Sequence, residues 1–199
     1  MIRLGLTGSI GMGKSTTAKL FADAGIPVHD ADAVVHDLYR GEAARLIEMA
    51  FPGTTRNGAV DRQVLGEQLA QEPGGFKRLE AIVHPLVRAR EQRFLKEQQA
   101  AGADLVILDI PLLFESGGAE RIDKVVVVSS DPQIQHQRVL ARPAMTEEKF
   151  RLILSRQMPD AEKRARADYV VDTGNGIEAA RKQVNDIIAD LRRTKDGGR

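Results

Sequence analysis

Short apolar runs bounded by Gly, Asp or Pro recur along the chain and predict buried β-strands. The clearest are residues 104–110 (DLVILDI) and 123–129 (DKVVVVS), which contain the uninterrupted apolar stretches LVIL and VVVV. Strands buried on both faces, as in the middle of a parallel sheet, have this character. Three shorter runs, at residues 2–7, 26–28 and 168–172, bring the prediction to five strands.

Between these runs, apolar residues recur at steps of three and four, which is typical of amphipathic helices. The sequence predicts such helices over residues 14–24 and 133–142, and a last one from Ile177 to Leu191. A further helix is expected after Thr146, which would cap it, with Phe150, Ile153, Leu154 and Met158 on one face. Strands separated by helices indicate an α/β fold with a parallel sheet covered on both faces. The polar, Gly-containing end at residues 194–199 is expected to fray.

Residues 33–101 carry no strand signal and are predicted to be mostly helical. We therefore expect a nucleotide-binding core formed by residues 1–32 and 102–199, with residues 33–101 inserted as a helical domain. Helix breaks are expected at Gly41, Pro52-Gly53, Asn57-Gly58 and Pro73-Gly74-Gly75.

Composition narrows the class of protein. The chain has 199 residues, 42% hydrophobic and 29% charged, which argues against disorder and fits one domain with an insertion. It has no Cys, so disulfides and thiolate chemistry are excluded. Lys and Arg number 29 against 28 Asp and Glu, and aromatics make up 4%, so we expect no nucleic-acid partner. No apolar segment approaches the roughly 20 residues that cross a bilayer, and the N-terminus does not resemble a signal peptide. We expect a cytoplasmic protein without a membrane partner.

The segment from Gly8 to Ser15, GSIGMGKS, matches the phosphate-binding pattern G-x-x-x-x-G-K-[ST] in full. It follows a predicted strand and opens a predicted helix, as that loop requires. Glycines let successive N–H groups point at phosphate oxygens, and the start of the helix adds its positive dipole end. Lys14 would contact the β- and γ-phosphates, and the Ser15 hydroxyl would ligate Mg²⁺. The sequence therefore predicts binding of a nucleoside triphosphate.

Carboxylates occur at the ends of two predicted strands, at the edge where open α/β sheets bind ligands. Asp109 ends an apolar strand and is a candidate for holding Mg²⁺, directly or through water; its alternative is a turn residue beside Pro111. Asp30 and Asp32 follow the second strand, and Asp32 is the better candidate for accepting the proton of a substrate hydroxyl. Its alternative role is the N-cap of the next helix.

A basic segment at residues 138–166 suits a lid that closes over a triphosphate. It contains eight basic and four acidic residues, whereas the whole chain has a net charge of +1. Arg138 and Arg142 are four residues apart and are expected to share a helix face, with Arg142 the better candidate for the transferring phosphate. A solvated helical face is the alternative for most of these residues.

His84 and Glu115 are weaker candidates. His84 precedes Pro85, so it lies near the acceptor's phosphates or simply before a helix that has Pro in its first turn. Glu115 belongs to the acceptor pocket or orders the loop at residues 111–114.

The chain contains no Asn-Lys-x-Asp guanine-reading motif, and it is short for a motor or transporter ATPase. A small sheet, a helical insertion and an Arg-bearing lid favour a small-molecule kinase. Two alternatives stay open. One is a kinase of the same core with shikimate or a nucleoside monophosphate as acceptor, and the other is a non-catalytic ATP-dependent switch.

Taken together, the motifs resemble those of the dephospho-coenzyme A (dephospho-CoA) kinase family. The resemblance rests on segments that occur in order from residue 5 to about 174. They are GLTGSIGMGKST (5–16), DADAVVHDL (30–38), HP (84–85), DIPLLFE (109–115), the pattern of Gln135, Arg138 and Arg142, SRQM (155–158) and ADYVVDTG (167–174).

This resemblance implies a P-loop NTPase fold of three α/β/α layers with a five-stranded parallel sheet, an acceptor-binding insertion and a lid. It also implies Mg²⁺-assisted phosphorylation of the ribose 3′-hydroxyl of dephospho-CoA by ATP. This chain departs from the family pattern at three places: the family usually has Gly where Ser9 stands, Ser or another small residue where Met12 stands, and often Asn near Thr173. Because backbone N–H groups make the cradle, neither of the two loop changes removes a required hydrogen-bond donor.

Carried over by position, the resemblance makes Asp32 the catalytic base, with Lys14 and Arg142 as its catalytic partners. The expected ATP-binding residues are Gly8, Gly11, Met12, Gly13, Lys14, Ser15, Thr16, Arg138 and Arg142. The expected acceptor-binding residues are Thr7, Asp32, His84 and Glu115, and the expected metal ligands are Ser15 and Asp109.

Overall fold

The computed structural model describes residues 1–196. These residues fall into two compact units, one formed by Met1–His29 with the chain from Gln98 onward, and the other by Asp30–Glu97. The second unit lies in the stretch between the second and third predicted strands where the sequence shows no strand signal. Its role in acceptor binding stays a prediction.

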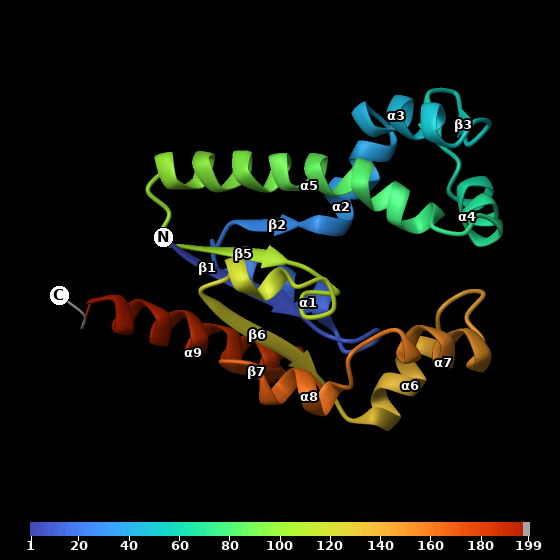
Figure 1. Cartoon of the computed structure of the whole chain (residues 1–199). Helices are drawn as coiled ribbons and strands as arrows, with labels where there is room; N and C mark the ends of the chain where they lie inside the picture. The colour runs from blue at the N-terminus through green and yellow to red at the C-terminus, as the bar shows by residue number, and fades with distance from the viewer. Residues whose placement is uncertain (197–199) are drawn as a thin grey trace. The chain divides into compact units, whose positions relative to one another are not determined.

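A five-stranded parallel sheet forms the middle of the first unit, as the sequence predicts, with the order β2-β5-β1-β6-β7 (Figure 1). β1 is the central strand, and its Leu6 is level with Asp109 at the end of β5. The loop after β1 therefore starts beside Asp109 at the carboxyl edge of the sheet. The strands are β1 (Ile2–Thr7), β2 (Val28–Asp30), β5 (Leu105–Asp109), β6 (Lys124–Ser129) and β7 (Tyr169–Asp172).

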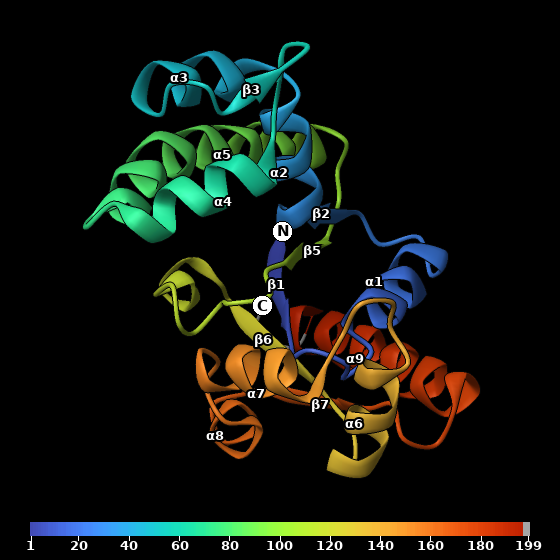
Figure 2. The same ribbon diagram turned by 90° about the vertical axis from the view of Figure 1, so that its right-hand side faces the viewer.

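Helices α1 and α9 pack on one face of this sheet (Figure 2). Phe21 of α1 and Val184 of α9 belong to a fully buried apolar cluster with the strands. On the sheet's other face, Leu113 and Ile122 lie against Gly5, where a Cβ atom would be 3.0 Å from each. The helices of this unit are α1 (Lys14–Asp23), the 3-10 helix η1 (Gly118–Arg121), α6 (Pro132–Leu140), α7 (Glu147–Ser155), α8 (Asp160–Ala165) and α9 (Ile177–Asp196).

The C-terminal ends of two helices differ from the sequence prediction. The helix α9 extends through Asp196, into the polar end that was expected to fray; the rest of that end, residues 197–199, lies outside the described residues. Thr146 caps α7 as predicted, by accepting a hydrogen bond from the N–H of Lys149, but α7 ends before Met158, which was expected on the same helix face.

The second strand begins two residues later than predicted because of how α1 ends. Gly25 has a φ of 80°, its N–H donates to Ala22 O, and the N–H of Ile26 donates to Phe21 O. This pair of bonds is a Schellman cap, which uses the backbone of Ile26 to close the helix. The chain joins the sheet only after that, where Pro27 O accepts from the N–H of Ile107.

The second unit contains four helices and a two-stranded antiparallel hairpin. Only a helix break was predicted at Asn57-Gly58, yet both residues have positive φ, 51° and 77°, and form the hairpin turn. The unit's core is a separate apolar cluster that includes Leu38, Ile47 and Phe51. The elements are α2 (Ala31–Tyr39), α3 (Glu42–Ala50), β3 (Thr55–Arg56), β4 (Ala59–Val60), α4 (Arg62–Gln71) and α5 (Gly75–Ala100).

The helix α5 runs without interruption through His84 and Pro85, so the prediction that a helix starts there is wrong. Pro85 has no N–H and leaves the carbonyl of Ala81 without its helical donor. Ala81 and Pro85 are both exposed, so solvent reaches this carbonyl. Val83, on the opposite side of the helix, is buried in the unit's core. Packing of the apolar face outweighs the one lost hydrogen bond.

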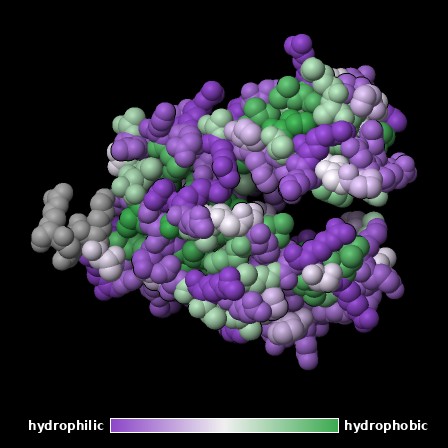
Figure 3. All heavy atoms as spheres, viewed as in Figure 1, coloured by the Kyte–Doolittle hydropathy of each residue, from purple (hydrophilic) through white to green (hydrophobic). Residues whose placement is uncertain are grey.

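The face shown in Figure 3 is mostly hydrophilic, with hydrophobic side chains in small scattered groups. Within the described part of the chain, no helix combines the length and the apolar character needed to cross a membrane.

Candidate active site

The loop between β1 and α1 has the geometry of a phosphate cradle. Gly11 and Gly13 have φ values of 79° and 93°, which residues with side chains rarely adopt. A Cβ atom at Gly11 would also collide with Val139, and one at Gly13 would lie 3.1 Å from Thr173 Oγ1. Gly13 is the N-cap of α1, so the first N–H groups of the helix point into the loop without intrahelical partners.

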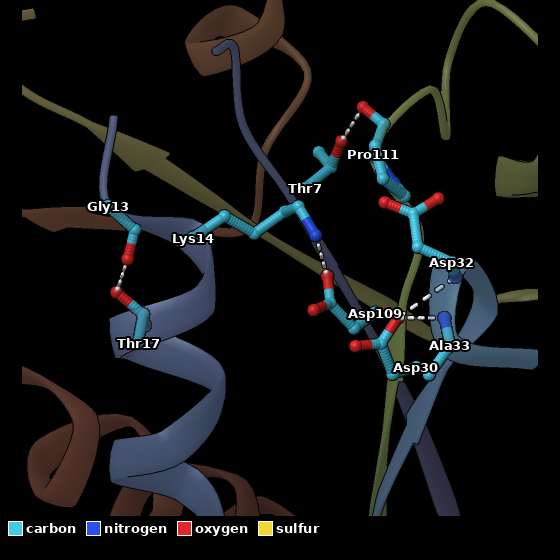
Figure 4. A network of polar contacts seen from close by, with 9 residues as sticks. All are labelled: Thr7, Gly13, Lys14, Thr17, Asp30, Asp32, Ala33, Asp109 and Pro111. Carbon is cyan, nitrogen blue, oxygen red and sulfur yellow. Dashed lines mark hydrogen bonds and ion pairs between the residues drawn. The ribbon is translucent and has the colours of Figure 1, made fainter. Parts of the chain in front are cut away.

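Lys14 forms an ion pair with Asp109 at this edge of the sheet (Figure 4). Lys14 Nζ lies 2.6 Å from Asp109 Oδ1, and the residue Asp109 is 2% exposed. A turn residue would not need a buried carboxylate, so the pairing with the loop lysine favours the functional interpretation of Asp109. The first turn of α1 presents Ser15 and Thr16 as exposed side chains next to this pair.

Two glutamines hold the loop on both sides of Ile10. The side-chain carbonyl of Gln157 accepts a hydrogen bond from the Ile10 N–H at 3.1 Å, and Gln135 Nε2 donates to Ile10 O at 2.7 Å. Gln135 is buried in α6, and Gln157 lies between α7 and α8. The conformation of the loop therefore depends on segments more than a hundred residues away in the chain.

Arg138 contacts the loop through Thr173 rather than directly. Its two terminal nitrogens donate to Thr173 Oγ1 and Thr173 O, each at 2.8 Å. The Thr173 hydroxyl in turn lies 2.8 Å from Met12 O and donates to it. In this structure Arg138 is a positioning residue, and its expected contact with ATP stays a prediction.

Replacing Thr173 by Val is expected to lower the free energy of unfolding by about 1–2 kcal/mol, because Met12 O loses its donor and Arg138 loses an acceptor. Urea unfolding followed by circular dichroism measures the change. Thr194→Val is the matched control, since that hydroxyl donates only within α9 on an exposed surface and its loss is expected to cost a few tenths of a kcal/mol. Equal effects of the two substitutions would contradict the role of Thr173.

Arg142 does not share a helix face with Arg138, which corrects the prediction. The helix α6 ends at Leu140, and the Arg142 N–H donates to Val139 O in the turn that follows. Pro143 cannot continue a helix, and Ala144 has a φ of 57°, so the chain turns sharply here. The Arg142 side chain is exposed, and the structure gives it no hydrogen bond within its own unit among the described residues.

Asp30, and not Asp32, caps the helix α2. Asp30 Oδ1 accepts from the N–H groups of Asp32 and Ala33, at 2.9 and 3.0 Å (Figure 4). The alternative role of Asp32 as the N-cap is therefore wrong. Within its own unit, and among the described residues, the exposed Asp32 carboxylate accepts no hydrogen bond, so it is available to a ligand.

A pocket of about 480 Å³ lies within the second unit. The guanidinium of Arg62 lies 5.2 Å from the centre of the Tyr39 ring, and burial raises the pKa of the Tyr39 phenol. Apolar walls with one cation and one carboxylate suit an elongated ligand that has both apolar and anionic parts. The lining includes Asp32, Val35, Tyr39, Arg62, Leu65 and Leu69.

The remaining residues that were expected to bind the acceptor occupy different surroundings. Thr7 is fully buried, and its hydroxyl donates to Pro111 O at 2.9 Å, so it fixes the loop after β5 (Figure 4). Glu115 accepts from the Met158 N–H at 2.8 Å and pairs with Lys163 at 2.9 Å. Burial raises the pKa of Glu115, but these two partners outweigh it and hold the pKa below its usual value. His84 is exposed on α5 in the second unit.

The residues at the loop fit a magnesium ion held together with a nucleotide. Within residues 1–196, no three His, Cys, Asp or Glu side chains gather as a metal-ligating group. Mg²⁺ in nucleotide sites needs only one or two protein oxygens, since phosphates and water complete its shell. The exposed Ser15 hydroxyl and the Asp109 carboxylate can supply such oxygen ligands.

Sequence reasoning missed the role of four residues at this site: Gln135, Gln157, Lys163 and Thr173. Three of them stand in segments already noted for their family pattern, but the pattern does not say which backbone group each side chain contacts. Lys163 was counted only as one basic residue of the lid, although its side chain is completely buried.

Comparisons with known proteins agree with these observations. The family model described as dephospho-CoA kinase matches residues 2–179. A dephospho-CoA kinase of Rhizobium etli is 69% identical over 192 residues, which cover 96% of this chain and 95% of that protein.

Solved structures show the same fold. The crystal structure of TT1252 from Thermus thermophilus has a TM-score of 0.82 and 35% identity, and the match covers 96% of this chain and 97% of that one. The dephospho-CoA kinase of Campylobacter jejuni has a TM-score of 0.73 at 24% identity, covering 97% and 98% of the two chains.

Proposed function

The chain belongs to the dephospho-CoA kinase family, and from that premise we propose how its residues carry out phosphoryl transfer. The reaction is the last step of CoA biosynthesis, in which ATP phosphorylates the ribose 3′-hydroxyl of dephospho-CoA. The observation that carries the assignment of roles is the Lys14–Asp109 pair at the mouth of the glycine loop. Family membership also supports the cytoplasmic location that the sequence predicts.

The loop and Lys14 bind the phosphates of ATP. The N–H groups at the start of α1 and the Lys14 ammonium supply positive charge where the β- and γ-phosphates would lie. Mg²⁺, when bound, would neutralise phosphate charge during transfer, and Ser15 and Asp109 are the residues that would hold it. Asp109 also orients Lys14, whose ammonium it contacts at 2.6 Å.

Asp32 acts on the acceptor. Its carboxylate would accept the proton of the 3′-hydroxyl as that oxygen attacks the γ-phosphorus. Two observations support this role: Asp30 performs the capping of α2, and Asp32 lines the pocket of the second unit. The apolar walls of that pocket would hold the pantetheine arm, and Arg62 would face an anionic group of the acceptor.

Arg142 would close over the transferring phosphate from the lid at residues 138–166. Arg142→Ala is expected to lower kcat roughly ten- to a hundredfold, because one charge-assisted donor to the transition state is lost. Steady-state kinetics measures the change, and the exposed Arg151 of α7, paired with Glu147, provides the matched control as Arg151→Ala. A kcat unchanged by Arg142→Ala would exclude this residue from the transition state.

An acceptor panel tests the proposed reaction. ADP release from Mg-ATP is measured with dephospho-CoA, shikimate, AMP or no acceptor, and we expect release only with dephospho-CoA. Release with shikimate or AMP instead would favour a kinase of the same core with a different acceptor. Tight ATP binding without release in any mixture would favour the ATP-dependent switch.

A further inference from the structure

The segment Arg156–Lys163, here called the strap, fastens the glycine loop to the rest of the first unit. It begins after α7 and ends inside α8. Gln157 accepts from the Ile10 N–H of the loop at 3.1 Å, and the next residue, Met158, donates its N–H to Glu115 at 2.8 Å. Further along, Asp160 Oδ2 accepts from Ser129 Oγ at the end of β6, also at 2.8 Å.

The strap is anchored by a buried ion pair. The Lys163 side chain is 0% exposed, and its ammonium lies 2.9 Å from Glu115 Oε1, the same oxygen that accepts from Met158. The ammonium makes no well-aligned hydrogen bond to a residue that the structure describes, so its contact with Glu115 is that of an ion pair. Lysine is almost never fully buried without a partner, so this pair fixes where the strap lies against the loop after β5.

The geometry of the glycine loop depends on the Ile10 peptide that the strap holds. Gln157 takes up the Ile10 N–H, and the Met12 N–H donates to Ser9 O, so these two groups face away from the phosphate position. The N–H groups that remain for phosphate are those around Gly11 and Gly13 and at the start of α1. A rotation of the Ile10 peptide would turn the following N–H groups out of the cradle.

We propose that the Glu115–Lys163 pair is a positioning element for ATP: it anchors the strap, and through Gln157 it holds the glycine loop in its phosphate-binding form. The proposal rests on the proposed function in so far as it takes the loop to bind ATP. It gives Glu115 a role on the nucleotide side of the reaction instead of contact with the acceptor. It also joins the lid helix α7 to the loop through a single short segment of chain.

Binding of a non-hydrolysable ATP analogue with Mg²⁺ tests this, measured by calorimetry beside a thermal melt. The double variant Glu115→Gln/Lys163→Met removes both charges together, so no unpaired charge stays buried. We expect it to fold and to raise the dissociation constant roughly three- to tenfold, and Gln157→Ala to do the same, as for the loss of one hydrogen bond. Because the two changes act along one path, combining all three substitutions should weaken binding no further than Gln157→Ala alone.

Lys182→Met is the matched control, since Lys182 is an exposed residue of α9 that pairs with Asp186. This variant should bind the ATP analogue as tightly as the wild type does. Wild-type affinity in the folded double variant, or in Gln157→Ala, would overturn the proposal. Additive losses of affinity in the combined variant would overturn the proposal too. A double variant that does not fold would also overturn it, because the pair would then stabilise the whole unit and not only the position of the strap. The assay contains no acceptor, so a failure of the proposed reaction appears separately in the acceptor panel.

Discussion

Asp32→Asn is expected to lower kcat by about 10²–10⁴, the range that general-base catalysis contributes. The amide has nearly the same size and leaves Asp30 to cap α2, so the helix stays intact. What is lost is the ability to take the proton from the attacking hydroxyl. ATP affinity is expected to stay within about twofold, because we propose that the nucleotide phosphates bind to the glycine loop of the other unit.

Steady-state kinetics with dephospho-CoA and ATP varied separately measures this, with calorimetry for the nucleotide alone. Asp37→Asn is the matched control, as Asp37 is an exposed carboxylate on the same helix and its loss should leave kcat unchanged. An Asp32→Asn enzyme with nearly full turnover would rule out Asp32 as the base.

Lys14→Ala is expected to reduce kcat/KM for ATP by roughly 10²–10³, because it removes the cation that we propose to contact the β- and γ-phosphates. The same substitution takes away the cation that pairs with the buried Asp109 carboxylate, which lies 2.6 Å from Lys14 Nζ. We therefore expect lower thermal stability in addition to weaker catalysis, and a partial recovery of stability when Asp109 is also changed to Asn.

Kinetics and a thermal melt on the same preparation separate these effects. Lys19→Ala, on the exposed face of the same helix, is the matched control and should behave as the wild type. Unaltered ATP kinetics in Lys14→Ala would refute the assignment of the loop.

The sheet could be predicted because its signal is local. The runs that form β5 and β6 are apolar and buried on both faces, and a central parallel strand requires this of each strand by itself. The start of β2 could not be read in the same way. Ile26 is apolar enough for a strand, but whether its backbone joins the sheet or closes α1 depends on the cap that Gly25 forms.

In the second unit, two elements could not be predicted from local sequence preferences. His84-Pro85 is a helix start by local preference, yet α5 continues because Pro85 lies on the exposed side and Val83 on the buried one. The hairpin at Asn57-Gly58 was missed for a different reason. Its turn residues were visible in the sequence, but two-residue strands are too short to show an alternating pattern.

At the candidate site, the motif predicted the glycine loop but not its supports. In the sequence DAD, both aspartates satisfy the preference for an N-cap, and only the backbone shows that Asp30 caps α2. Arg138 and Lys163 look alike as basic residues of a lid, although one reaches Thr173 and the other is buried against Glu115. Such roles depend on contacts between segments far apart in the chain, which no local pattern records.

The position of the transferred phosphate tests the central claim most directly. The protein is incubated with Mg-ATP and dephospho-CoA, and the products are followed by phosphorus NMR together with the amount of ADP. The account predicts one new phosphomonoester signal on the ribose 3′-oxygen for each ADP formed, and its loss in Asp32→Asn. ADP without this product, or a phosphate at another oxygen, would contradict it.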